Sequence, residues 1–374
     1  MKRHMLHLLL TLVLGGLVAG VAPAFQGNDE GGIGGTGIVP AQTGPDEGGI
    51  GGTGIIGVIS DFGSIVVNGV HVDYDLGMAL SDPAVSMPLT AADLKLGEVV
   101  AVLAVAEGAR YRALEIERRT ALVGTVTALD VRHNLLEVMG QPVLLADDTF
   151  IGDPELLPGT RVAVAGLWDG RVLYATRVQT ARSQTDQLFG PVNVREGNKL
   201  MVGDILVTGV TPGSMQLPMR TGEQILVLGQ AVNGNLEAAR FVLQRADRFG
   251  SGTREFLVEG YPIQGTDGLW LQGLQLEGEP VLPGRRHVAS GRLSVRDRLQ
   301  VRSSAQPASP TPGTEARRWP ETKARMINQF ERANDNSPVR RERNSGGGIG
   351  SRGGYSRDVG GSGGGRGARG GGRH

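Results

Sequence analysis

The sharpest group of potentially reactive side chains in the sequence is His71, Asp73 and Asp75, which are spaced by two residues. On a β-strand this spacing places all three side chains on one face and the residues between them on the other. One imidazole and two carboxylates could hold a divalent cation, so these residues are a candidate metal site. The alternative, which we favour, is an ordinary solvated strand face, because the same alternation predicts it.

Two tryptophans form the second candidate site, for a saccharide ligand. Trp168 precedes the pair Asp169-Gly170, and Trp270 follows the pair Asp267-Gly268. Asp-Gly is typical of hairpin turns, so both indoles are expected near the ends of hairpins. An exposed ring at such a position could stack on a sugar or a base. Packing of the hairpin end is the favoured alternative, since tryptophan is mostly buried.

Other kinds of site find no support. The sequence contains no cysteine, which excludes disulfides, thiolate metal ligands and a cysteine nucleophile. The glycine-rich motif GIGGTG is not followed by Lys-Ser/Thr and opens a strand instead of a helix, so it does not match a phosphate-binding loop. No G-x-S-x-G elbow opens a predicted helix. We therefore expect a non-enzymatic protein without a cofactor.

The C-terminal segment 302–374 is basic, with 14 Lys and Arg against 6 Asp and Glu, and the residues before it are acidic on balance. From Ser345 the chain is mostly Gly, Ser and Arg, a composition typical of disorder. Arg-Gly segments bind anions through phosphate attraction and arginine stacking, although a tail that merely solubilises the protein is the alternative. The expected anion-contacting side chains are Arg352, Arg357, Arg366, Arg369 and Arg373.

The elements that would position these residues are strands. The stretch Gly54–Asp75 is dense in valine and isoleucine and contains Asn68-Gly69 between two such runs, which predicts a hairpin. Similar units follow three more times. The segment before each unit's fourth strand shares a glycine at a spacing of 62 or 63 residues, and the glycines are Gly97, Gly159, Gly222 and Gly284. Such a fixed period predicts a repeat architecture.

Each unit reads as three strands, a connection and two strands. In the first unit the connection contains Thr90 as a plausible helix N-cap, Asp93 at its third position and Gly97 as a stop. This order predicts an all-β chain of about four tandem five-stranded OB-like barrels with disordered termini. An SH3-like barrel or a flatter sandwich is the alternative. The run 99–105 is apolar on both faces, so we expect a neighbouring unit to cover it.

The sequence divides into seven parts. These are a signal peptide (1–24), a Gly-rich flexible leader (25–53), barrel repeats (54–119, 120–183 and 184–250), a degenerate fourth repeat (251–301) and a disordered basic Gly/Arg-rich tail (302–374). Within the tail, Pro320–Ala333 could form a short helix with Ala324, Ile327 and Phe330 on one stripe.

The first 25 residues indicate export. Lys2 and Arg3 precede an apolar run, and Ala22-Pro23-Ala24 fits the small-x-small rule for cleavage after Ala24. A retained membrane anchor is the alternative, because the uncharged run Met5–Phe25 is long enough to span a bilayer. We expect a periplasmic or extracellular protein.

Three features resemble bacterial exported proteins of domain-of-unknown-function family 5666. They are the GGIGGTGI lead-in, the V-x-G-x-V hairpin and the L-x-x-G-x-x-V-x-V-x-G-type strand. The likeness covers Gly54–Asp247 well and Phe256–Val301 loosely. It implies an exported chain of small β-barrel repeats and supplies no catalytic residue or ligand.

Two functions are compatible with these features. The first is a non-enzymatic, envelope-associated binding or scaffold protein whose basic tail contacts an anionic envelope polymer or polysaccharide, with peripheral membrane contact possible and no specific nucleic acid partner. The second is an oligosaccharide-binding module of the cell envelope, as OB folds permit by analogy. An uncharacterised enzyme is the third and least supported reading.

Overall fold

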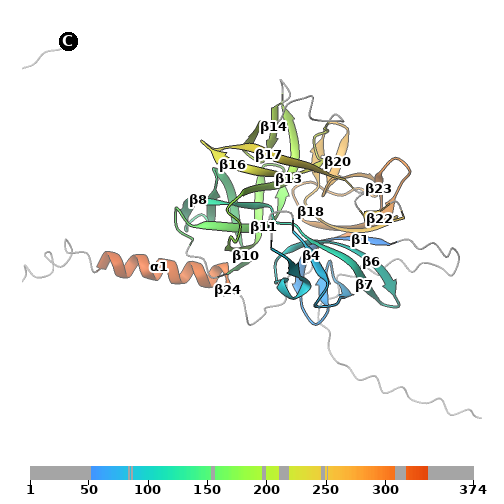
Figure 1. The fold of residues 1–374 in the computed structure, drawn as a ribbon, viewed down its shortest axis with the longest axis horizontal. Coiled ribbons are helices and arrows are strands. Elements are labelled where there is room, and N and C mark those ends of the chain that lie inside the picture. Colours follow the sequence, from blue (N-terminus) through green and yellow to red (C-terminus); the bar gives the residue numbers. More distant parts are fainter. Residues whose placement is uncertain are drawn as a thin grey trace, which may run out of the picture. The chain divides into compact units, whose positions relative to one another are not determined.

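A computed structural model describes residues 52–335, apart from 83–84, 86, 153–155, 196–198, 210–218, 246–248, 251 and 308–316. The predicted signal peptide, most of the leader and the end of the tail lie outside the described residues. The described part is almost entirely strand, with one α-helix, α1 (Figure 1). In that part no helix is both long and apolar enough to cross a membrane.

The first repeat is a closed five-stranded barrel. The five strands that form it are β1 (Thr53–Asp61), β2 (Ile65–Val67), β3 (Val70–Asp73), β6 (Val99–Glu107) and β7 (Arg110–Arg118). They pair in the order β1-β2-β3-β7-β6 and back to β1, and only β3 and β7 are parallel. The connection between β3 and β6 holds β4 (Ala79–Ser81), β5 (Leu89–Thr90) and the 3₁₀ turn η1 (Ala91–Asp93).

The next two repeats follow the same circuit. The second contains β8 (Leu122–Asp130), β9 (Leu135–Val138), β10 (Gln141–Ile151), β11 (Arg161–Asp169) and β12 (Val172–Thr180). The third contains β13 (Asp186–Arg195), β14 (Lys199–Val202), β15 (Ile205–Thr208), β16 (Gln224–Val232) and β17 (Asn235–Gln244). In both, the third and fifth strands are parallel and the first pairs with the fourth, which closes the barrel.

The fourth repeat has the same strands with one break. Its strands are β18 (Glu255–Gly260), β19 (Ile263–Gly265), β20 (Gly268–Leu271), β21 (Leu274–Gly278), β22 (His287–Leu293) and β23 (Arg298–Ala305). β18 pairs with β22 and β19 pairs with β20, so together they take the place of one long first strand. The break falls at Tyr261-Pro262, where proline cannot donate a ladder hydrogen bond.

The predicted fold class is therefore confirmed: the chain is all-β, with tandem five-stranded barrels of OB-type strand order. The Asn68-Gly69 hairpin also forms, with both residues at positive φ (57° and 77°) as a type I′ turn requires. Asp93 accepts a hydrogen bond from the backbone N–H of Thr90 (3.0 Å), as the capping pattern predicts.

Strand pairing also joins different repeats. β1 pairs in parallel with β18 over Thr53–Ile56, so the first and fourth repeats share one sheet. β8 pairs with β13 at Leu122 and Val123, so the second and third repeats share another. The strand predicted to be covered on both faces is β6. Val100 and Val102 lie in the first barrel's core, whereas Ala101 packs with the core of the fourth repeat.

Three local predictions need correction. The connection expected after the third strand of the second unit is partly strand, because β10 continues to Ile151, where a register break lets it pair with β12 a second time. The turn expected at Asp169-Gly170 lies one residue later, since Asp169 still pairs with Val172. The segment assigned to a disordered tail contains the end of β23, the short strand β24 (Arg317–Arg318) and α1 (Trp319–Asp335).

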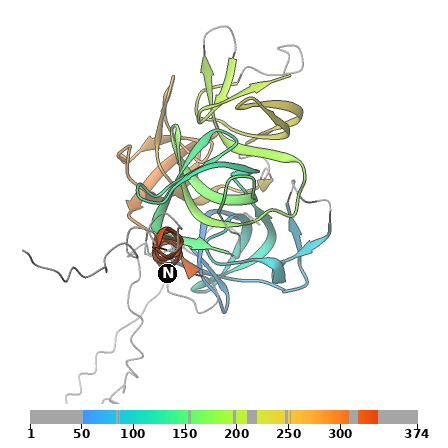
Figure 2. The same cartoon turned by 90° about the vertical axis from the view of Figure 1, so that its left-hand side faces the viewer.

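Helix α1 is held by its first two turns. Trp319 is fully buried in the core of the second repeat, and Met326 packs in the same cluster. β24 pairs with the end of β10, beside the start of α1 (Figure 1). Figure 2 shows the helix nearly end-on. Of the predicted stripe, Ala324 is exposed, Ile327 is half-buried and the side chain of Phe330 lies outside the described residues. The buried positions are Trp319, Thr322 and Met326.

Candidate functional site

The three residues of the candidate metal site have separate partners. The His71 ring is hydrogen-bonded to Ser64 Oγ through Nδ1 (2.9 Å). Asp73 forms an ion pair with Arg110 (2.8 Å), and Asp75 lies beyond the end of β3 and accepts from the backbone N–H of Gly77 (2.7 Å). The described residues contain no group of three or more His, Asp or Glu side chains placed to hold a metal ion. The geometry therefore gives the metal hypothesis no support.

Trp168 offers no exposed face for stacking, because it is only 6 % exposed and is packed into the third repeat. In the other repeats the first residue of the central turn folds its side chain over the glycine of the first strand, as Asn68 does over Gly57. The third repeat has Gly203 at that turn position and lacks such a side chain. Trp168 of the second repeat takes its place, and its Nε1–H donates to the carbonyl of Phe189 (2.8 Å).

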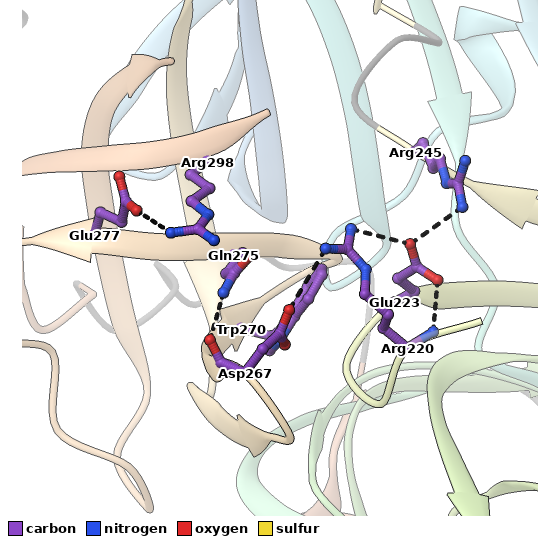
Figure 3. Close-up of polar contacts among 8 residues, drawn as sticks. All are labelled: Arg220, Glu223, Arg245, Asp267, Trp270, Gln275, Glu277 and Arg298. Carbon is purple, nitrogen blue, oxygen red and sulfur yellow. Dashed lines mark hydrogen bonds and ion pairs between the residues drawn. The ribbon is translucent and has the colours of Figure 1, made fainter. Parts of the chain in front are cut away.

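Trp270 is likewise buried, at 2 % exposure, where the fourth repeat meets the third. A Cβ at Gly222 of the third repeat would lie 2.7 Å from its Cδ1, so only glycine allows this approach. Figure 3 shows the Arg220 guanidinium above the ring (4.9 Å to its centroid), between the carboxylates of Asp267 and Glu223. The indole Nε1–H is directed at Asp267 Oδ1 (3.1 Å). Both predicted stacking residues therefore join repeats.

The five arginines proposed to contact anions lie outside the described residues. The structure does contain one concave polar feature that the sequence did not reveal, a cleft of about 320 Å³ where the first repeat meets the second. The first repeat contributes Asp82, Val85, Asp93, Lys95 and Arg118. The second contributes Thr120, Val123, Gly152, Ala163, Arg177, Gln179, Thr180, Ala181, Arg182 and Ser183. We call this feature the inter-repeat cleft.

The inner wall of the inter-repeat cleft is an ion-pair network. Arg118 Nε binds Asp82 Oδ2 (2.7 Å), and its Nη1 reaches Glu98 Oε1 (3.3 Å). Gln179 of the second repeat donates to the same Glu98 oxygen (3.2 Å). Arg177 donates to the carbonyl of Leu96 (3.0 Å). Polar groups from both repeats thus satisfy one another, and this wall is fixed by its own contacts.

Within this network, burial is the main influence on the pKa of the Glu98 carboxyl group. The Glu98 side chain is almost wholly removed from solvent, and desolvation raises the pKa of its carboxyl group above the ordinary value. The nearby charges of Arg118 and Arg177 act in the opposite direction and only partly offset that rise.

The rim of the cleft is cationic and more open. Arg182 is 64 % exposed, and its ion pair with Asp93 is a long one, 3.9 Å. The Lys95 side chain is exposed and has no ion-pair partner among the described residues. The lining also includes small residues, such as Gly152 and Ala181, and polar side chains, such as Thr180 and Ser183. The cleft therefore combines available positive charge with neutral hydrogen-bonding groups.

Sequence reasoning missed this cleft because its residues are far apart in the chain and belong to two repeats. One signal was present. Glu98 follows Gly97 directly at the corner before the fourth strand, and Glu223 follows Gly222 at the equivalent corner of the third repeat. In both cases the carboxylate accepts the backbone N–H three residues earlier, from Lys95 and from Arg220. A carboxylate at this corner marks where another repeat docks.

The comparisons with known proteins concern the first two repeats. The model of the family described as "Domain of unknown function (DUF5666)" matches residues 53–117 and 123–179. Neither the curated proteins nor the solved structures provide a match. The two matched segments coincide with the two barrels whose contact creates the inter-repeat cleft.

Proposed function

This chain carries two tandem domains of the DUF5666 family, and for it we propose the role of a non-enzymatic, exported scaffold and binding protein of the cell envelope. In this proposal the joined barrels form the scaffold, and the basic segment after α1 contacts anionic surface polymers.

The observation that carries the proposal is the docking of α1. Trp319 is buried in the second repeat and donates through Nε1 to Asn134 Oδ1 (3.0 Å). Lys323 donates to the same oxygen (2.7 Å), and the Arg318 guanidinium lies over the Phe150 ring (5.1 Å). The helix that precedes the basic segment is therefore fixed to a barrel. Arginines that follow a fixed helix would link the barrels to any polyanion that they bind.

The test is retention on an immobilised polyanion, dextran sulfate. We expect the full mature chain to be retained at low salt and released as the salt concentration rises, because screening weakens contacts between exposed charges. A chain without Asn344–His374 keeps α1 and the barrels and should elute early. A neutral dextran column is the control. Unchanged retention of the shortened chain on dextran sulfate would refute the role of the tail.

A second candidate function, saccharide binding, is favoured by the inter-repeat cleft. Its volume lies at the lower end of the range for small-molecule sites. The saccharide site is thus proposed in the polar cleft, which solvent can reach, and not at the tryptophan rings, which are buried.

A further inference from the structure

We propose that the inter-repeat cleft binds a small anionic polyol, an acid group on a hydroxylated ring of the size of one hexuronic acid unit. The inference deepens the saccharide-binding candidate and rests on it, but it does not depend on the basic tail.

The acid group is assigned to the rim by charge. Lys95 and Arg182 present two cations from two different repeats. Asp93 lies 3.9 Å from Arg182, and its Oδ2 is already used by the Thr90 N–H. The inner arginine Arg118 is held by Asp82 and Glu98 and does not add to this charge. A carboxylate or phosphate at the rim would gain charge-assisted hydrogen bonds from both sides.

The hydroxylated ring is assigned to the interior by the chemistry of the lining. The Thr180 hydroxyl can both donate and accept. Ser183 Oγ is already bonded to Thr185, and the Gln179 amide to Glu98 and Arg177, so each of these side chains has only part of its hydrogen-bonding capacity left. Gly152, Ala163 and Ala181 leave the space open, because none has a side chain larger than a methyl group. Ring hydroxyls could bond to the Thr180 hydroxyl and to the remaining lone pairs and N–H of Ser183 and Gln179, which an apolar ligand could not do. The volume of about 320 Å³ limits the ligand to roughly one ring.

The experiment is isothermal titration of the full mature chain with three sugars. Glucuronate is the primary probe, glucose is the neutral control, and glucose 6-phosphate tests whether a phosphate serves as well as a carboxylate. We expect saturable binding of at least one of the two anionic sugars with one site per chain, and binding of glucose that is about tenfold weaker or more.

Variants distinguish specific binding in the cleft from nonspecific electrostatic attraction to the surface. Lys95→Ala with Arg182→Ala removes the rim charge and should weaken binding about tenfold, whereas Lys199→Ala with Arg296→Ala removes two exposed cations from other repeats and should leave it unchanged. Ala181→Leu keeps every charge and fills the cleft, so it should abolish binding. Circular dichroism confirms that each variant is folded.

The outcomes are distinct. Equal binding of glucose and glucuronate would overturn the inference and leave saccharide binding standing. No binding of any of the three sugars would remove both. Binding that survives Ala181→Leu would place the ligand outside the cleft and overturn the inference. None of these results affects the proposed role of the tail, which retention on dextran sulfate tests separately.

Discussion

At the scale of single residues, glycine permits one repeat to dock on another. The four glycines that precede the fourth strands, Gly97, Gly159, Gly222 and Gly284, all have positive φ, which confirms that they are equivalent positions. Two of them, Gly97 and Gly222, also lie in close contact with a neighbouring repeat. At Gly97 a Cβ would lie 2.6 Å from Phe150 Cδ2 and 2.6 Å from the Thr176 carbonyl, both in the second repeat. At Gly159 it would meet no atom within 4 Å.

This contrast gives the first prediction. Gly159→Ala should cost about 1–2 kcal/mol of unfolding free energy through backbone strain alone. Gly97→Ala carries a similar strain and in addition displaces Phe150 and the backbone of β12, so it should cost a further 1–3 kcal/mol or so. Urea denaturation of the two variants measures the difference. Equal losses would show that the two barrels are not held together at this corner.

The second residue-scale prediction concerns the pH dependence of stability that Glu98 causes. Its pKa is raised in the folded protein by burial, so the native state binds the proton more tightly than the unfolded chain does. The contribution of Glu98 to stability is therefore greatest below the ordinary carboxyl pKa and decreases as the pH rises from there through the raised value. Glu98→Gln removes this titration. Its stability relative to the natural protein should increase with pH across that window.

Denaturation midpoints at several pH values check this prediction, and the sign of the trend decides it. A constant difference between the two proteins would mean that the carboxyl pKa is not shifted. A difference that falls with pH would mean that the arginines outweigh burial. Glu115→Gln, which replaces an exposed carboxylate on β7, is the matched control for the change of Glu to Gln.

At the scale of elements, the sequence predicts strands and turns well because they depend on local patterns. Asn68-Gly69 can adopt its turn whatever surrounds it, and alternating valines define β-strands wherever they occur. Features that depend on distant partners were missed. Gly203 looks like any turn glycine, and only the structure shows that Trp168 fills the space above it. The cleft needs two repeats to meet, and their contact leaves only the carboxylate after Gly97 as a trace in the sequence.

Helix α1 shows the same limit and carries the third prediction. Its buried stripe runs through Trp319 and Met326, not through Ala324, because the surface of β10 and β24 selects which face docks. Trp319→Ala should cost about 3 kcal/mol, since it removes a fully buried indole and its hydrogen bond to Asn134. Arg325→Ala lies on an exposed face of the same helix and should change stability by less than about 0.5 kcal/mol.

Limited proteolysis gives a second measurement on these two helix variants. If Trp319 anchors α1, its removal should expose the helix to cleavage while the barrels stay resistant, and the Arg325→Ala protein should be cut as slowly as the natural one. A Trp319→Ala protein with unchanged stability and unchanged cleavage would show that the helix is held elsewhere, and the proposed link between barrels and tail would lose its support.

At the scale of the whole molecule, the repeats are tied at more points than a linear array would be. β1 joins the first repeat to the fourth, and β8 joins the second to the third. Arg177 links the second repeat to the first, and Trp270 links the fourth to the third. Each repeat therefore contacts at least two others through buried groups. Small barrels of about 60 residues are marginally stable alone, so these contacts should make their unfolding cooperative.

The chain contains three tryptophans, and each lies at a different contact, which allows a direct test of that cooperativity. Trp168 reports on the contact between the second and third repeats, Trp270 on that between the third and fourth, and Trp319 on the docking of α1. In three variants that each keep one tryptophan and carry Phe at the other two positions, the fluorescence midpoint in urea should coincide with the midpoint from far-UV circular dichroism on the same sample. The Trp→Phe changes shift the midpoint of each variant, so the comparison is made within a variant. If Trp270 fluorescence changed at a lower urea concentration than the circular dichroism did, the fourth repeat would separate first, and the pairing of β1 with β18 would be too weak to hold it.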